Sequence, residues 1–452
     1  MEGEINIIAS KEECEVLAID VDDGISFLVD NILSSIPPNP STLCSIFRVP
    51  DNLKRGYEDK YEPSIVSIGP YHCAKQNLKI TEKHKLWYLH GFISRATPPQ
   101  TSFKDMVKGV KNQEEKARAC YAEEIHISSD DFVKMMVIDG CFILELFYRK
   151  WEDHREEDLI YSAPWIIETV KQDLVLLENQ LPFFILVCLF QLNEHHNRSL
   201  NYMVLEFFYL ESNSYKLFSK MGLSKRSTNM VEGSHILDFL RNCLIPGEFH
   251  PTADPASVIH SVNLPCAKDL QEMGVKFKRT RSLPNTMFLD VKFEEGCLTS
   301  IYLPNGIMYS LFPNWIALEQ CHRHFKGYIT SYTILLGQLV HSKDDMKILR
   351  KTGIFYGNEN EYEKFVTEIK MLCQRAKPIE YHYAALRTNV RRYTRTCCNR
   401  QRANLHNWNV ILGRDYFGTP WAVISFIGAV VLLVLTAIQT IYTVRSYFSK
   451  KG

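Results

Sequence analysis

The chain has 452 residues, with 52 lysines and arginines balanced by 52 aspartates and glutamates. This length allows two or three ordinary domains or one large one. A net charge of zero gives no indication of an acidic or basic partner, and no nucleic-acid partner is predicted. The thirteen cysteines form no CxxC pair and several lie in apolar runs, which favours a reducing compartment over a disulfide scaffold.

Residues 1–43 are predicted to form an acidic N-terminal segment with one short amphipathic helix. Apolar residues recur at helical spacing from Ile25 to Ile36, and the prolines from Pro37 onward end the pattern. The first residues lack the basic region and apolar stretch of a signal peptide. The segment from Tyr61 to His72 holds two prolines and a glycine, which favours an ordered irregular conformation over a long helix or a central strand.

Residues 44–415 are predicted to form one large helical domain, so the expected fold class is mainly α. Ser128, with Asp131 three residues later, reads as the N-cap of a long helix. Pro182 divides a very apolar stretch into two helices. The helical pattern covers residues 82–95, 102–124, 128–147, 164–192, 202–222, 234–244, 313–325, 328–339, 342–349, 361–374 and 380–402.

The region 273–303 has a different pattern. Apolar and polar residues alternate there in three short runs separated by turn residues, which predicts a small antiparallel β-sheet inserted in the helical domain. Residues 246–265 hold several prolines without periodicity and are predicted to be a linker or an exposed loop.

Residues 416–444 are predicted to be one transmembrane helix. No charged residue occurs between Asp415 and Arg445, and this run exceeds the roughly 20 apolar residues that cross a bilayer. Pro420 suits a first helical turn, and aromatic residues flank both ends. A buried core helix is the alternative interpretation. Residues 445–452 would form a short basic tail.

The simplest topology is a single-pass tail anchor in the plasma membrane or an endomembrane, with the body in the cytosol. Basic residues flank both sides of the helix, so the charges do not decide its orientation. An arginine cluster precedes the helix and could contact anionic lipid, or could form a solvated helix face. Membrane lipid is therefore one expected partner, through Arg387, Arg391, Arg392 and Arg395.

The sequence contains no phosphate-binding loop, dinucleotide fingerprint, GxSxG elbow or HExxH motif. The histidines of His195-His196 and of His322 and His324 lack the paired spacing of a zinc site, so no metal or other cofactor is predicted. Four polar residues occur in apolar surroundings and form a candidate polar site: Asp139, Glu178, Asn179 and Gln180. Such residues could hold a substrate, but they more often cap helix ends and satisfy buried backbone.

Several segments in a fixed order resemble one family. They are Tyr61–His72 (YEPSIVSIGPYH), Phe132–Glu145, Asp173–Phe184 (DLVLLENQLPFF), Asn314–Cys321 (NWIALEQC) and Tyr416–Trp421 (YFGTPW). By these segments the chain resembles the plant domain-of-unknown-function 247 family, from about residue 46 to residue 447. The resemblance implies a mostly helical protein with one C-terminal membrane helix and no assigned biochemistry. Some grass members of the family are linked to self-incompatibility loci.

Two functions are compatible with these features. The first is a membrane-anchored recognition or signalling protein without enzymatic activity, which binds a protein partner that the sequence does not identify. A role in self-incompatibility is a special case that only the family resemblance suggests. The alternative is an enzyme with a buried polar pocket around Asp139 and Glu178-Gln180.

Overall fold

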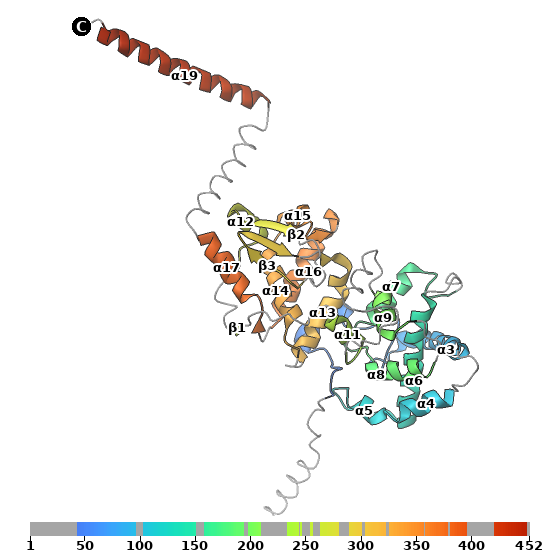
Figure 1. The fold of residues 1–452 in the computed structure, drawn as a ribbon. Coiled ribbons are helices and arrows are strands. Elements are labelled where there is room, and N and C mark those ends of the chain that lie inside the picture. Colours follow the sequence, from blue (N-terminus) through green and yellow to red (C-terminus); the bar gives the residue numbers. More distant parts are fainter. Residues whose placement is uncertain are drawn as a thin grey trace, which may run out of the picture.

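The protein is mainly α-helical, as its sequence predicts, and carries small β-sheets and one long C-terminal helix (Figure 1). The computed structural model describes residues 43–95, 103–150, 158–193, 198–208, 233–243, 245, 254–255, 263–279, 289–300, 303–321, 325–356, 358–377, 380–395 and 420–449. The predicted amphipathic helix near the N-terminus and most of the predicted linker 246–265 lie outside the described residues.

The first group of helices surrounds the long helix α6. Its members are α2 (Asp51–Lys54), η1 (Glu58–Lys60), η2 (Gln76–Leu78), α3 (Lys79–Ser94), α4 (Phe103–Lys111), α5 (Glu114–Arg118), α6 (Ser129–Arg149), α7 (Pro164–Asp173), α8 (Phe183–Gln191) and α9 (Leu200–Phe208). Helix α6 begins as predicted, because the Ser128 side chain accepts a hydrogen bond from the Asp131 amide. Helices α3, α4, α8 and α9 pack against it. Gly140 permits the close approach of α8, since a Cβ atom there would lie 2.4 Å from Leu189.

The second group of helices follows in the chain and lies beside the first (Figure 1). Its members are α11 (Ile236–Asn242), α12 (Ala267–Glu272), α13 (Asn305–Cys321), α14 (Tyr328–Leu339), α15 (Lys343–Lys351), η5 (Glu359–Glu361), α16 (Tyr362–Arg375) and α17 (Ala384–Arg395). Helix α14 packs on α13 and α16, and α11 packs on α13. A capping box between Ser342 and Asp345 starts α15. Helix α13 begins eight residues before the predicted start at Pro313, which it contains.

The predicted sheet exists, but its strands are mixed rather than all antiparallel. Strands β2 (Lys276–Arg279), β3 (Lys292–Glu294) and β4 (Cys297–Ser300) are ordered β2-β4-β3. β3 and β4 form the expected hairpin, and β2 pairs with β4 in parallel. Alternation along a strand reports which face is buried and not which way the neighbouring strand runs, so the pattern missed this pairing.

Two further sheets have two strands each. β1 (Asp254–Pro255) pairs antiparallel with β7 (Glu380–Tyr381), and β5 (Leu303–Pro304) pairs parallel with β6 (Phe355–Tyr356).

One hydrophobic core runs through both helix groups, and residues 45–72 lie against both of them. Ile46, Val66 and Ile68 of this segment are fully buried or nearly so. Asn314 of α13 joins the groups: its side chain accepts a hydrogen bond from the Leu177 amide and donates one to the Lys60 carbonyl. The irregular segment is therefore part of the core packing.

Helix α19 (Pro420–Ser449) extends away from the other helices (Figure 1). Residues 424–443 are exposed, although their mean hydropathy of 2.3 is that of a membrane span. Within the described part of the chain this is the one helix that is long and apolar enough to cross a membrane. It continues past Arg445, where the sequence predicts the basic tail to begin.

Candidate functional site

The candidate site is built around the irregular segment Tyr61–His72, because its backbone must find hydrogen-bond partners outside a helix or sheet. Asp173, the last residue of α7, provides three of them. Its carboxylate accepts from the amides of Ser64 (2.9 Å), Ile65 (2.7 Å) and Val66 (2.8 Å). A buried carboxylate that accepts several amides stabilises the loop that it binds.

Asn179 binds the backbone of the same irregular segment, next to the residues that Asp173 binds. Its side-chain oxygen accepts from the Ile68 amide at 2.7 Å, and its side-chain nitrogen donates to the carbonyls of Val66 at 3.0 Å and Asp173 at 2.9 Å. All of these groups are shielded from water. Asn179 therefore uses both ends of its amide to hold backbone.

Gln180 supports the turn that connects α7 to α8. Its side-chain nitrogen donates to the carbonyls of Leu174 and Leu176, both at 2.8 Å. Its side-chain oxygen accepts from the Leu237 amide in α11 at 3.2 Å. The bond to the Leu237 amide links the two helix groups. The bonds to Leu174 and Leu176 satisfy carbonyls that follow the end of α7.

Asp139, on α6, binds the far end of the irregular segment. One carboxylate oxygen accepts from the Gly69 amide at 2.8 Å, and the other contacts the Lys85 ammonium at 2.6 Å. Lys85 also donates to the Ser67 carbonyl. Gly69 has a positive φ of 70°, and a Cβ atom there would lie 2.7 Å from the Gln180 carbonyl oxygen. Only glycine fits this position without strain.

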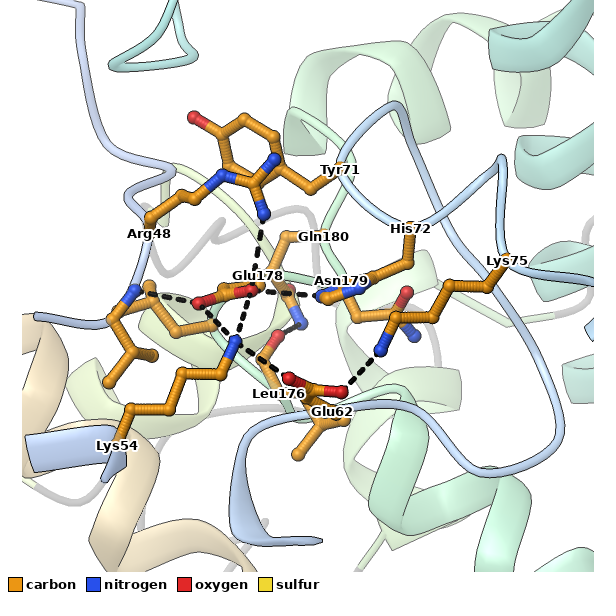
Figure 2. A network of polar contacts seen from close by, with 12 residues as sticks. Arg48, Lys54, Glu62, Tyr71, His72, Lys75, Leu176, Glu178, Asn179 and Gln180 are labelled. Atoms are coloured by element: carbon orange, nitrogen blue, oxygen red, sulfur yellow. Dashed lines mark hydrogen bonds and ion pairs between the residues drawn. The ribbon is translucent and has the colours of Figure 1, made fainter. Parts of the chain in front are cut away.

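Glu178 points away from its two neighbours and lies at the centre of a charged cluster (Figure 2). Its carboxylate accepts from the Val49 amide at 2.9 Å and lies 3.0 Å from the His72 ring, 3.3 Å from Lys54 and 3.6 Å from Arg48. The cluster has an exposed side, because the Arg48 side chain is 43% exposed whereas Glu178 is 1% exposed.

The cluster extends outward through alternating charges. Lys54 also pairs with Glu62 at 3.0 Å, and Glu62 pairs with Lys75 at 2.5 Å. Arg48 stacks over the Tyr71 ring at 4.5 Å and pairs with Glu123 at 2.8 Å. Each buried charge thus has an opposite charge close by, which offsets the cost of taking it out of water.

The surroundings shift the pKa values of these carboxylates in different directions. Burial is the largest influence on the pKa of Glu178 and acts to raise it, but His72, the Val49 amide and Lys54 together hold it below its usual range. The hydrogen bond from Lys75 is the main cause that lowers the pKa of Glu62 to about 2. Burial raises the pKa of Asp139, and Lys85 offsets part of that effect.

All four residues of the candidate polar site thus bond to backbone, and three of them, Asp139, Glu178 and Asn179, bond to residues 49–72. Asp139 and Asn179 meet on residues 66–69, Gln180 holds the α7–α8 turn, and Glu178 joins the charged cluster. This is the arrangement of groups that satisfy buried backbone.

The arginine cluster is divided by burial. Arg387 is buried and its guanidinium lies 5.2 Å from the centre of the Tyr381 ring. Arg391 is half-buried, and Arg392 and Arg395 at the end of α17 are exposed. Of the four predicted lipid contacts, Arg387 therefore belongs to the packing of the body.

Sequence reasoning did not assign a role to several residues that complete these contacts. Lys85 shares the helical face of Tyr88 and Phe92, and a lysine on an apolar face signals a buried acidic partner. Asp173 opens an apolar run, which is a similar signal. Glu319 of α13 accepts from Arg241 and from the Ile329 and Thr330 amides, and sequence gave no signal for these partners.

Neither metal nor disulfide chemistry is visible in the described ranges. No group of three or more metal-ligating residues occurs there, and His195, His196, His322 and His324 lie outside them. The ten cysteines within those ranges are free thiols. Burial raises the pKa of the Cys141 and Cys243 thiols, the latter to about 12, so both are unreactive apolar groups.

Comparison with known proteins places the chain among plant sequences. Residues 46–435 match the DUF247 family, described as plant protein of unknown function. The chain is 29% identical to UPF0481 protein At3g47200 of Arabidopsis thaliana, across 90% of this chain and 88% of that protein. It is 23% identical to Putative UPF0481 protein At3g02645 of the same plant, across 89% and 91% of the two chains. No solved structure matches. The family match spans most of the chain, so this protein belongs to the plant domain-of-unknown-function 247 family.

Proposed function

We propose that this chain is a membrane-anchored protein that acts by recognition or signalling through a protein partner, without enzymatic activity of its own. Helix α19 supplies the anchor and the helical body supplies the recognition surface. The proposal does not extend to self-incompatibility, for which neither the structure nor the relatives give support.

The proposal that the protein is not an enzyme rests on the hydrogen bonds that the candidate polar residues make. Asp139, Asn179 and Gln180 direct their side-chain oxygens and nitrogens to backbone groups and to Lys85. A catalytic group must keep an atom free for substrate. Side chains committed in this way instead stabilise the irregular segment.

One contact favours the alternative of an enzyme. The carboxylate of Glu178 and Nε2 of His72 lie 3.0 Å apart, which is the distance of an acid–base pair, although the ring is not oriented for a hydrogen bond between them. His72 is 3% exposed, however, and Glu178 also holds the Val49 amide. We therefore assign this pair to the support of residues 49–72.

The exposed apolar surface of α19 supports the anchor. A helix with this composition that is exposed from residue 424 to residue 443 would expose a large apolar area to water, and a bilayer removes that cost. The exposed Arg392 and Arg395 on α17, with the half-buried Arg391, would contact anionic headgroups next to the anchor. The free thiols support a body on the cytosolic side.

Alkaline carbonate extraction of membranes tests the anchor. The full chain should stay in the membrane pellet, and a variant with Leu432→Arg and Leu435→Arg should be released, because each arginine at the centre of a span costs about 3 kcal/mol. The pair Leu159→Arg and Trp165→Arg, on exposed apolar residues of the body, is the matched control and should remain in the pellet. Release of the wild-type chain would refute the proposal.

A further inference from the structure

Helix α3 presents two large apolar side chains to solvent. Leu86 is 51% exposed and Trp87 is 67% exposed, and they are adjacent in the chain. The opposite face of the helix is anchored by the buried Tyr88 and Phe92 and packs against α6. Neighbouring apolar side chains that are held outward by a rigid helix are a common mark of an interaction surface.

Positive charge without an acidic partner flanks these two side chains. Lys79 and Lys83 are exposed, and neither pairs with an acidic residue in the described ranges. The acidic residue of the same turns, Glu82, is engaged by Lys85 at 2.6 Å. The outer face of α3 is therefore both basic and apolar.

The indole of Trp87 is held in place by its neighbour. The His84 ring packs edge-on against it, with ring centres 5.6 Å apart and an angle of 83°. Among the residues that the structure describes, none accepts a hydrogen bond from the Trp87 N–H. The ring thus offers an apolar body and a free donor at the surface, as tryptophans do at membrane–water interfaces.

We propose that this face of α3 docks on the anionic surface of the membrane that α19 spans. Leu86 and Trp87 would enter the headgroup region, and Lys79 and Lys83 would attract anionic lipid. The proposal rests on the proposed anchoring. Charge selects lipid as the occupant, because the two flanking lysines complement an anionic surface over a broad area.

The place of α3 in the fold gives this contact a consequence. Helices α3 and α17 stand at opposite ends of the body (Figure 1). A body that is tethered beyond α17 and docked through α3 would lie along the membrane, and α3 would immobilise the end of the body that the anchor does not hold.

Fluorescence quenching by brominated lipid tests the docking in the full chain, reconstituted in vesicles with and without phosphatidylserine. Bromine atoms near the headgroup quench only tryptophans that enter the interface. Trp87→Phe should lower the quenched part of the fluorescence in anionic vesicles. Trp165→Phe is the matched control, because Trp165 is also 67% exposed but lies on α7, and this change should not lower it. Lys79→Glu with Lys83→Glu should abolish the Trp87 contribution.

Three other outcomes would overturn the proposal. If Trp87→Phe leaves the quenched part unchanged while the chain resists carbonate extraction, α3 docking fails and the anchor stands. If the wild-type chain is extracted by carbonate, the anchoring fails and the docking fails with it. If Trp87 becomes shielded from acrylamide only as protein density rises, and not from brominated lipid, a second copy of the chain covers α3.

Discussion

Replacement of Asn179 by alanine tests whether the candidate polar site is structural. The change removes one acceptor and two donor contacts, and leaves the Ile68 amide and the Val66 carbonyl without a partner, while the Asp173 carbonyl keeps the Leu176 amide. Asn179 is 1% exposed, so water cannot replace it without rearrangement. Each buried polar group left unpaired costs about 1–3 kcal/mol, and the two together should destabilise the protein by about 2–6 kcal/mol.

This loss is large compared with the about 5–15 kcal/mol that stabilises a typical domain. Urea unfolding of the full chain in mild detergent, followed by the fluorescence of its tryptophans, measures it. With an m value of about 3 kcal/mol per molar urea, the unfolding midpoint should fall by about 1–2 M. Trp315 of α13 is fully buried and reports on the core.

Asn112→Ala is the matched control, because Asn112 is exposed beyond the end of α4 and its side chain holds no backbone. This substitution should stay within about 0.5 kcal/mol of wild type. An Asn179→Ala variant as stable as the control, or more stable than wild type, would refute the structural role. A gain in stability on removal is the behaviour of residues kept for catalysis.

Three further substitutions test Gly69, beside the same segment, and two other buried polar residues, His235 and Glu319. Gly69→Ala should destabilise the protein by about 2–4 kcal/mol, because it combines a positive φ with a Cβ atom 2.7 Å from the Gln180 carbonyl oxygen. Gly56 has a φ of 77° but lies in open space, so Gly56→Ala should cost only about 1 kcal/mol. Equal effects of the two substitutions in urea unfolding would contradict this prediction. Burial lowers the pKa of His235, so the unfolded chain binds a proton below about pH 6.5 that the folded chain does not, and stability should fall between pH 7.5 and 5. That fall in stability should be smaller in His235→Asn. An unchanged pH dependence in this variant would show that His235 does not cause the fall. Glu319→Gln should lower the free energy of unfolding by about 3–5 kcal/mol, because it leaves the buried Arg241 without its counter-charge. A thermal unfolding midpoint within roughly 1–2 °C of wild type, about the error of the measurement, would contradict this prediction.

The local part of the fold could be predicted from sequence because its causes are local. Ser128 and Asp131 start α6, and Pro182 precedes the first residue of α8. The Glu-Glu-Gly turn before β4 also follows a local rule, since Glu295 and Gly296 have the positive φ values of 50° and 75° that a tight hairpin requires. Helix boundaries and turns of this kind depend on neighbouring residues in the chain.

The partners of the polar residues could not be predicted, because they are distant in sequence. Asn179 binds an amide 111 residues earlier, and Glu178 binds one 129 residues earlier. The apolar surroundings of these residues in the sequence indicated only that their polar groups must find hydrogen-bond partners. The direction of β2 was missed for the same reason, because its parallel pairing with β4 is a property of the connection between them.

Glycosylation mapping tests the proposed arrangement in the membrane most directly. One version of the full chain carries an acceptor sequon added after Lys451, and the natural sequon at Asn197 reports on the body. With α19 across the bilayer and the body in the cytosol, the added acceptor should be modified and Asn197 should remain bare. Modification of Asn197 with a bare tail would place the body outside the cytosol and contradict the account.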